Sequence, residues 1–161
     1  MTRSALLLLA LGLVAPALAD PTADARAVGD AFAKAMAAGD VPAVLALYRD
    51  DASIIWPGQG EEATGKAEIE KIVRATLASG PKDLRFVQKS NQARALGSDY
   101  IVNVGRWEMT YTTPRERRVS QVVRTSEVLQ KTDGKWLYLV DHASIGTPPA
   151  PTRAHRRHPT P

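Results

Sequence analysis

The spacing of the apolar residues changes once along this chain, at Gly80, and this change limits the possible folds more than any other feature. Before Gly80, apolar residues recur at the 3.6-residue spacing of a helix face. After it, they alternate with polar residues, as in half-buried strands. Helices followed by a run of strands are typical of the α+β class. We therefore expect a cone-like, curved antiparallel sheet whose concave face is covered by three N-terminal helices.

Cap and turn residues divide the first half of the chain into helices and one strand. Gly39 can end the first helix in a left-handed conformation, and Asp40 with Pro42 can begin the second. The expected elements are a helix over Thr22–Ala38, a short helix with the stripe Val41, Val44, Leu45 and Tyr48, a strand over Ala52–Trp56, a loop over Gln59–Gly65 and a helix over Lys66–Ala78.

Four strands are expected in the second half. The pair Asp133-Gly134 is a strong signal for a two-residue hairpin turn, and Pro114 marks another turn. The predicted strands are Leu84–Ser90, Tyr100–Thr112, Val119–Lys131 and Trp136–Ile145. Because they follow one another through short turns, they should form an antiparallel meander.

Both ends of the chain differ from its middle. Residues 1–19 carry Arg3, an apolar run and the sequence Ala17-Leu18-Ala19, the pattern of a cleaved secretory signal peptide. The alternative is an N-terminal membrane anchor. Residues 147–161 are rich in proline and arginine and contain no large apolar residue, so we expect a disordered tail. The expected domain is residues 20–146. It should be secreted, and periplasmic if the source is Gram-negative, with no stable membrane anchor after cleavage.

Cleavage of the signal peptide gives a direct prediction. The mature protein should begin at Asp20, the residue after the Ala17–Ala19 site. Intact-mass spectrometry of the protein from its native source should therefore show a chain that lacks residues 1–19. A native protein that retains Met1 would contradict the prediction.

Charge and composition exclude several classes of function. The chain has 21 Lys and Arg against 17 Asp and Glu. The excess is accounted for by four arginines outside residues 20–146: Arg3, Arg153, Arg156 and Arg157. A neutral domain is not expected to bind nucleic acid. The chain has no cysteine and three histidines, two of them in the tail, so we expect no disulfide, metal site or other cofactor.

Two segments resemble a known superfamily. Residues 39–69 read GDVPAVLALYRDDASIIWPGQGEEATGKAEI, and residues 133–144 read DGKWLYLVDHAS. Over about residues 22–146 the chain resembles the nuclear-transport-factor-2-like superfamily, in its SnoaL-like or ketosteroid-isomerase-like branch. The second segment also resembles relatives of the calcium/calmodulin-dependent kinase association domain. The resemblance implies a cystatin-like α+β roll, but the fold hosts many functions.

The resemblance also excludes one mechanism. Ketosteroid isomerases use a carboxylate base before the proline, a tyrosine on the first helix and a protonated carboxylic acid on the sheet. The matching positions here are Trp56, Phe32 and, within one residue, Glu127. Tryptophan cannot abstract a proton and phenylalanine cannot donate a hydrogen bond, so this mechanism is not expected.

Alternation along the strands predicts which side chains face the helices. Together with the helical stripes, it predicts an apolar and aromatic cavity with a few polar groups, a composition typical of small-molecule sites. The predicted lining residues are Phe32, Tyr48, Trp56, Val73, Asn103, Trp107, Thr125, Glu127, Leu139 and Asp141. The alternative is a filled core in which the aromatic residues only pack.

Glu127 and Asp141 are the candidate catalytic residues. If both face the cavity, burial and mutual repulsion would raise the pKa of at least one. Alternatively, Glu127 pairs with a strand arginine or faces solvent. Asp141, His142 and Ser144 do not form a triad, because adjacent residues of a strand point to opposite faces.

Three functions are compatible with the sequence. The first is a secreted SnoaL-like domain that binds a small apolar molecule. The second is an enzyme of the lyase or isomerase type that uses Glu127 or Asp141. The third is a non-catalytic dimerisation or interaction module with a filled pocket. We also expect a homodimer formed through the outer sheet face, where Val122, Val128 and Tyr138 are expected beside Arg124, Ser126 and His142.

Overall fold

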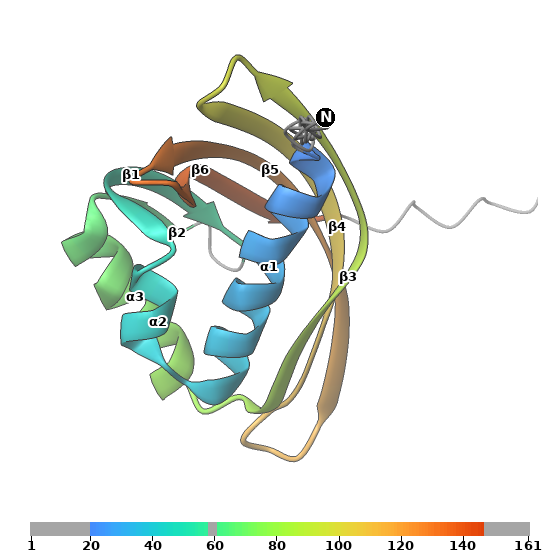
Figure 1. Cartoon of the computed structure of the whole chain (residues 1–161). Helices are drawn as coiled ribbons and strands as arrows, with labels where there is room; N and C mark the ends of the chain where they lie inside the picture. Colours follow the sequence, from blue (N-terminus) through green and yellow to red (C-terminus); the bar gives the residue numbers. More distant parts are fainter. Residues whose placement is uncertain (1–19, 58–60, 147–161) are drawn as a thin grey trace, which may run out of the picture.

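The computed structural model describes residues 20–57 and 61–146, which form a curved sheet with helices against its concave side (Figure 1). The predicted signal peptide and the predicted disordered tail lie outside the described residues. The α+β class is confirmed. None of the helices in the described part of the chain is long and apolar enough to cross a membrane.

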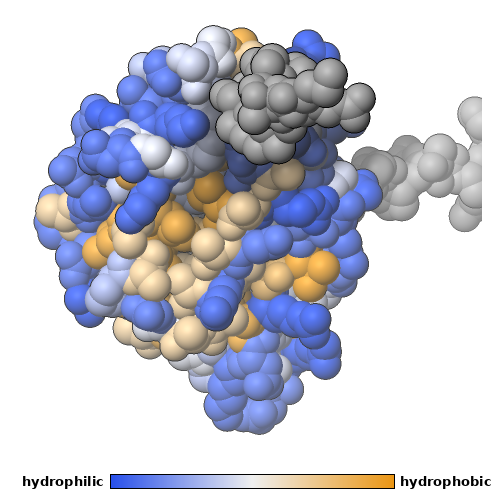
Figure 2. Space-filling model, viewed as in Figure 1, coloured by the Kyte–Doolittle hydropathy of each residue, from blue (hydrophilic) through white to orange (hydrophobic). Residues whose placement is uncertain are grey.

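Gly39 ends the first helix and Asp40 begins the second, as predicted. Helix α1 spans Pro21–Ala38, and the Asp20 carboxylate accepts hydrogen bonds from the first-turn N–H groups. Gly39 ends it at φ 67°, a left-handed conformation that favours glycine. Helix α2 spans Val41–Leu45 and is capped by the Asp40 side chain. Figure 2 shows apolar surface gathered around these helices and framed by hydrophilic surface.

The sheet has six strands in the order β2-β1-β6-β5-β4-β3, and it is mixed rather than wholly antiparallel. The second half of the chain forms four long strands, and each contains one of the four strands predicted there. They pair as an antiparallel meander, as predicted. The strands are β1 Tyr48–Trp56, β2 Glu61–Thr64, β3 Lys82–Leu96, β4 Tyr100–Thr112, β5 Arg118–Thr132 and β6 Lys135–Ile145; helix α3 spans Lys66–Ala78.

Two predictions about the first half were wrong. Tyr48 belongs to β1, not to the second helix, because it pairs in parallel with Tyr138 of β6. Residues 61–64 of the predicted loop form β2, which pairs with the end of β1. The start of β1 depends on pairing with β6, which lies far away along the chain, and β2 depends on pairing with β1. The local spacing of apolar residues does not reveal such pairing.

A β-bulge corrects one predicted orientation. The register between β5 and β6 shifts between Val128 and Leu129, so that Leu129 pairs with Tyr138 and Val128 with Val140. Leu139 lies between the two registers and is half-buried, whereas Tyr138 is 3% exposed and faces the helices. Tyr138 is therefore not on the outer face, as the predicted dimer surface required. Val122, which is exposed, and Val128, which is half-buried, keep their outward positions, and the homodimer stays a prediction.

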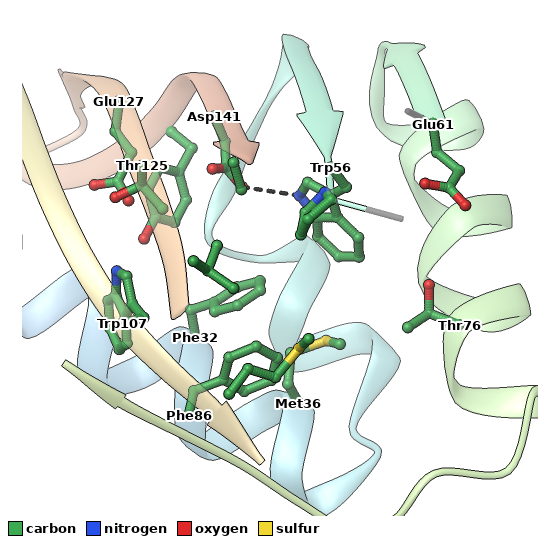
Figure 3. A pocket seen from close by; sticks show the side chains of 15 residues that line it. Phe32, Met36, Trp56, Glu61, Thr76, Phe86, Trp107, Thr125, Glu127 and Asp141 are labelled. Carbon is green, nitrogen blue, oxygen red and sulfur yellow. Dashed lines mark hydrogen bonds between the residues drawn. The ribbon is translucent and has the colours of Figure 1, made fainter. Parts of the chain in front are cut away.

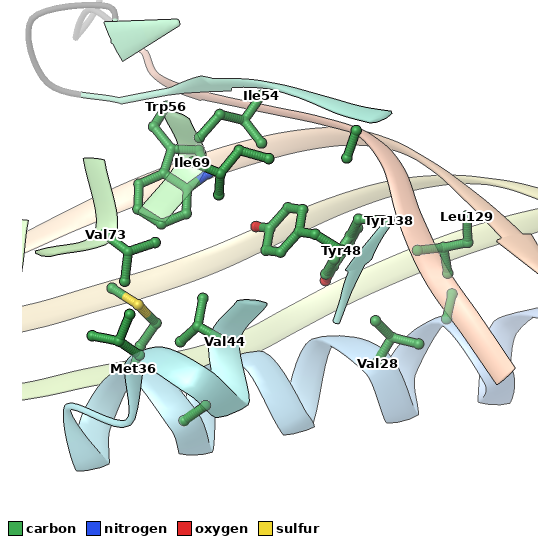
Figure 4. Packing of buried hydrophobic residues seen from close by; sticks show 14 of the residues in the cluster. Val28, Met36, Val44, Tyr48, Ile54, Trp56, Ile69, Val73, Leu129 and Tyr138 are labelled. Carbon is green, nitrogen blue, oxygen red and sulfur yellow. The ribbon is translucent and has the colours of Figure 1, made fainter. Parts of the chain in front are cut away.

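Buried side chains of the helices and of the sheet pack against one another between the two layers (Figure 4). Tyr48, Ile69, Val73 and Leu129 are each 0% exposed, and the Tyr48 and Tyr138 rings lie 5.0 Å apart between their centroids. Aromatic and aliphatic side chains from all layers thus hold the helices on the sheet.

Gly29 allows α1 to approach the sheet closely. A Cβ atom at this position would lie 2.8 Å from Cζ2 of Trp107, a side chain that is 5% exposed. Helix propensity alone predicts that Gly29→Ala stabilises α1 by about 1 kcal/mol. Over-packing costs about 1–3 kcal/mol, so we expect a net loss of about 1 kcal/mol in the free energy of unfolding. Urea denaturation should measure it, and a gain in stability would contradict this account of the contact.

Candidate functional site

A cavity of about 110 Å³ lies between α1 and the concave face of the sheet (Figure 3). Its walls are mainly apolar and aromatic, and its polar groups are few. The lining residues are Phe32, Met36, Trp56, Pro57, Glu61, Thr76, Phe86, Trp107, Met109, Val123, Thr125, Glu127, Tyr138, Asp141 and Ala143. This inner cavity is smaller than the range of about 300–1,000 Å³ that is typical of small-molecule sites.

A wider groove adjoins the inner cavity and adds the missing space. It encloses about 700 Å³ between α3 and strands β3, β4 and β5. The cavity and the groove share five lining residues, Pro57, Glu61, Thr76, Phe86 and Met109. The site is therefore a narrow chamber with a broad mouth, and together they are large enough for a small organic molecule.

Two carboxylates face each other in the chamber. Glu127 of β5 and Asp141 of β6 are direct partners across the antiparallel pair, and they are 5% and 6% exposed. Figure 3 shows them with Thr125 at one end of the pocket, while Glu61 and Thr76 lie on the opposite side. No ion pair involves Glu127 within the part of the chain that the structure describes, so the predicted arginine pairing is not found.

Asp141 is held by two hydrogen bonds to one oxygen. The Tyr48 hydroxyl donates to Oδ2 at 2.6 Å, and the Trp56 indole N–H donates to the same Oδ2 at 3.0 Å. Burial raises the pKa of Asp141, while these two hydrogen bonds act against the rise. Tyr48 and Trp56, both in β1, thus orient the Asp141 carboxylate.

Glu127 has a different environment. Its Oε2 accepts one hydrogen bond, from Nδ2 of Asn103 at 2.7 Å. Burial, and next the negative charge of Asp141, raises the pKa of Glu127 to about 7. Glu127 can therefore gain or lose a proton near neutral pH, which is the property required of a general acid or base.

Two further buried oxygens lie near the pair without a partner. Among the described residues, Thr125 Oγ1 and Asn103 Oδ1 form no hydrogen bond. Thr125 is 7% exposed and lines the chamber, next to Glu127 on the same face of β5. Buried polar atoms are usually hydrogen-bonded, so this hydroxyl is available to a bound molecule.

Aromatic rings form a second part of the chamber wall, around Phe32. Phe32 of α1 meets Trp56, Phe86 and Tyr138 edge to face, with ring centroids 5.9, 5.8 and 6.4 Å away. These contacts fix the rings as one rigid surface.

The structure brings together most of the predicted residues. Phe32, Trp56, Trp107, Thr125, Glu127 and Asp141 line the chamber. Tyr48, Val73 and Asn103 are each 0% exposed and lie behind the lining, and Leu139 is not a lining residue because of the bulge. Sequence reasoning missed Met36, Phe86 and Met109, whose apolar spacing on α1, β3 and β4 could have indicated them, and Tyr138, which no local pattern places inward.

The neighbours of Asp141 on β6 point away from the chamber. His142 and Ser144 are exposed on the outer face, whereas Asp141 is buried on the inner one. No group of three His, Cys, Asp or Glu side chains that could hold a metal ion occurs among residues 20–57 and 61–146.

The curved sheet with a chamber under α1 has the fold of a cystatin-like α+β roll, which a solved nuclear-transport-factor-2-like protein shares. The chain belongs to the SnoaL-like domain family, whose model matches residues 25–148. A comparison with proteins of curated function found no match.

Solved structures support the same fold. A protein from Xanthomonas campestris, provisionally named a calcium/calmodulin-dependent protein kinase II association domain, is 26% identical with a TM-score of 0.72, over 84% of this chain and 93% of that chain. A ketosteroid isomerase-like protein from Erwinia carotovora is 22% identical with a TM-score of 0.69, over 81% and 100%. A provisionally named dehydratase from Streptomyces avermitilis is 18% identical with a TM-score of 0.70, over 80% and 97%. Because the last two proteins are less than 25% identical to this chain, their similarity is evidence for a common fold alone.

Proposed function

We propose that this domain binds a small, predominantly apolar molecule in the chamber and its mouth, with Glu127 contacting the polar group of that molecule. The observation that carries the proposal is the pair of buried carboxylates, Glu127 and Asp141, in a largely apolar chamber without a paired cation among the described residues. Burying such groups is costly, and their perturbed pKa values are typical of functional sites.

The chamber also favours binding over simple core packing. A filled core would leave no space, whereas about 110 Å³ is open beside Thr125 and the carboxylates. An interaction module has no need of this space or of the unpartnered Thr125 hydroxyl.

Calorimetric titration can test the proposal. We expect saturable binding of at least one member of a panel of six- to ten-carbon compounds with neutral, cationic and anionic head groups. Thr76 lines both the chamber and the groove, so Thr76→Trp should block the mouth and abolish binding. Ala67→Trp places the same bulk on the exposed face of α3 and should leave binding intact. Failure of every compound to bind, or binding that Thr76→Trp does not affect, would overturn the proposal.

A second function, acid–base catalysis of the lyase or isomerase type, is favoured by one observation. Glu127 has a pKa of about 7 inside the chamber, so it can take a proton from a bound molecule and return it. In D₂O, a catalytic protein should exchange deuterium into the carbon next to a carbonyl of a bound ketone. Glu127→Gln should abolish this exchange, whereas exposed Glu62→Gln should not. Equal exchange in wild type and Glu127→Gln would reject Glu127 as the base.

A further inference from the structure

We propose that the bound molecule is an organic cation: an ammonium group that enters the chamber, attached to an apolar body that occupies the groove. This inference rests on the proposed binding function and specifies its ligand class. It depends on the charge of the lining, the set of free acceptor atoms, the aromatic wall and the shape of the site.

The charges of the chamber have one sign. Glu61, Glu127 and Asp141 line it, and the lining contains no Lys, Arg or His among the described residues. An anionic ligand would add a like charge to this surface. A neutral apolar ligand would exclude water from the carboxylates without compensating them. A cation alone both fills the space and neutralises the site.

The free oxygen atoms beside the pair can all accept hydrogen bonds, while the Trp107 indole N–H is a donor that also lines the chamber. Asn103 occupies Oε2 of Glu127, and Tyr48 and Trp56 occupy Oδ2 of Asp141. Among the described residues, no hydrogen bond reaches the other oxygens, Glu127 Oε1 and Asp141 Oδ1. Among these residues Thr125 Oγ1 also has no partner at hydrogen-bond geometry, although its hydroxyl lies close enough to Glu127 to lower the pKa of that carboxyl. A primary ammonium carries three donors and no acceptor, so these three oxygens match its bonding requirements.

The aromatic side chains favour the same ligand. The chamber that Glu127 and Asp141 line is also lined by four aromatic side chains: Phe32, Trp56, Trp107 and Tyr138. Ring faces attract a cation through their quadrupole, most strongly where water is excluded. Enclosures of several aromatic rings recognise ammonium groups in other proteins, above all methylated ones.

The groove has an apolar floor that suits an apolar body, although Lys71, Ser79 and Gln121 also line it. Ile72, Leu84 and Tyr111 line it beyond the shared residues Phe86 and Met109. A ligand with its charged end at Glu127 would lay its hydrocarbon part along these side chains and toward solvent. The site thus matches an amphiphile rather than a small inorganic cation.

Three ligands of one chain length distinguish head-group charge: hexylammonium, 1-hexanol and hexanoate. By calorimetry at pH 8, we expect hexylammonium to bind about tenfold or more tightly than 1-hexanol, the ratio that one hydrogen bond to a charged group supplies. Hexanoate should bind more weakly than 1-hexanol.

Matched variants locate the preference. Glu127→Gln keeps the size and one acceptor oxygen but removes the charge, so it should reduce the ratio of hexylammonium to hexanol affinity toward one. Glu62→Gln, on the exposed side of β2, should leave the ratio unchanged. Circular dichroism should show that both variants fold.

The pH dependence adds an independent measurement. The charged group that faces Glu127 is Asp141 of β6. Its other neighbours on the sheet are neutral: Tyr48 of β1, Tyr138 of β6 and Asn103 of β4. Helix α1 contributes the uncharged Phe32. Between pH 6 and 8 Glu127 loses its proton, and an alkylammonium keeps its charge, as lysine does. Affinity for hexylammonium should therefore rise over this range while affinity for 1-hexanol should not.

The outcomes separate this inference from the proposed function. If 1-hexanol or hexanoate binds as tightly as hexylammonium, and Thr76→Trp blocks that binding, the cation inference is overturned while the binding function stands. If none of the panel binds, both are overturned. A preference for hexylammonium that survives in Glu127→Gln also rejects the inference, because the charge would then be recognised elsewhere.

Discussion

Replacing Trp56 with alanine should lower the free energy of unfolding by about 3–5 kcal/mol, the range for truncating a buried aromatic side chain. Trp56 is 8% exposed, packs against the edge of Phe32 and lines the chamber. Its removal deletes apolar contacts and enlarges the cavity. It also deletes one of the two hydrogen-bond donors that hold Asp141.

Trp56→Phe separates these effects. Phenylalanine keeps an aromatic ring in the core but has no N–H, so the variant should lose about 1–3 kcal/mol, mainly from the missing hydrogen bond to the buried carboxylate. Urea denaturation of both variants and of wild type should measure the two losses. If Trp56→Ala unfolded with nearly the wild-type midpoint and slope, the indole would not be a structural part of the chamber.

The helices and the meander could be predicted because their signals are local. Asp20 and Asp40 satisfy the free N–H groups of the helix starts, and Gly39 takes the left-handed conformation that ends α1. The Asp133-Gly134 turn, with both residues at positive φ, connects β5 to β6 as its sequence indicates. These interactions join residues only a few positions apart, so the sequence shows them directly.

The first strand and its neighbour were not predictable in the same way. Val41, Val44, Leu45 and Tyr48 have helical spacing, yet the helix ends at Leu45 because Tyr48 pairs with β6, about ninety residues away. Strand β2 is short and largely polar, and it exists only because it pairs with β1. Long-range pairing outweighs local propensity in both cases.

The centre of the site could be predicted because alternation holds along β5. Glu127 and Thr125 face inward together, and register then places Asp141 opposite Glu127. The same argument fails one step further along β6. At the bulge opposite Val128 and Leu129, Leu139 is an extra residue in β6. It reverses the alternation, so that Tyr138 points inward in place of Leu139. The hydrogen bonds that fix Asp141 also depend on β1, whose start the sequence does not mark.

Glu127 should also make the protein less stable as the pH rises from 5 to 8. Its pKa is about 7 in the folded protein against 4.5 for an ordinary glutamate, because the 5% exposed carboxyl is buried beside Asp141. The folded state therefore binds this proton more tightly than the unfolded state does. The stabilisation is complete below pH 4.5 and disappears as the pH rises through about 7. Over the interval from pH 5 to 8 the loss should be about 2–3 kcal/mol.

Glu127→Gln isolates this contribution. The amide cannot ionise, and its carbonyl oxygen can still accept the hydrogen bond from Asn103 that Glu127 accepts. The variant should thus have a flatter dependence of unfolding free energy on pH, and it should exceed wild type in stability at pH 8. Glu62→Gln, an exposed carboxyl exchanged in the same way, should follow the wild-type curve. Urea unfolding at a series of pH values measures the difference. Parallel curves for Glu127→Gln and wild type would mean that Glu127 is already ionised at pH 5, and the chamber would then hold two charges even without a ligand.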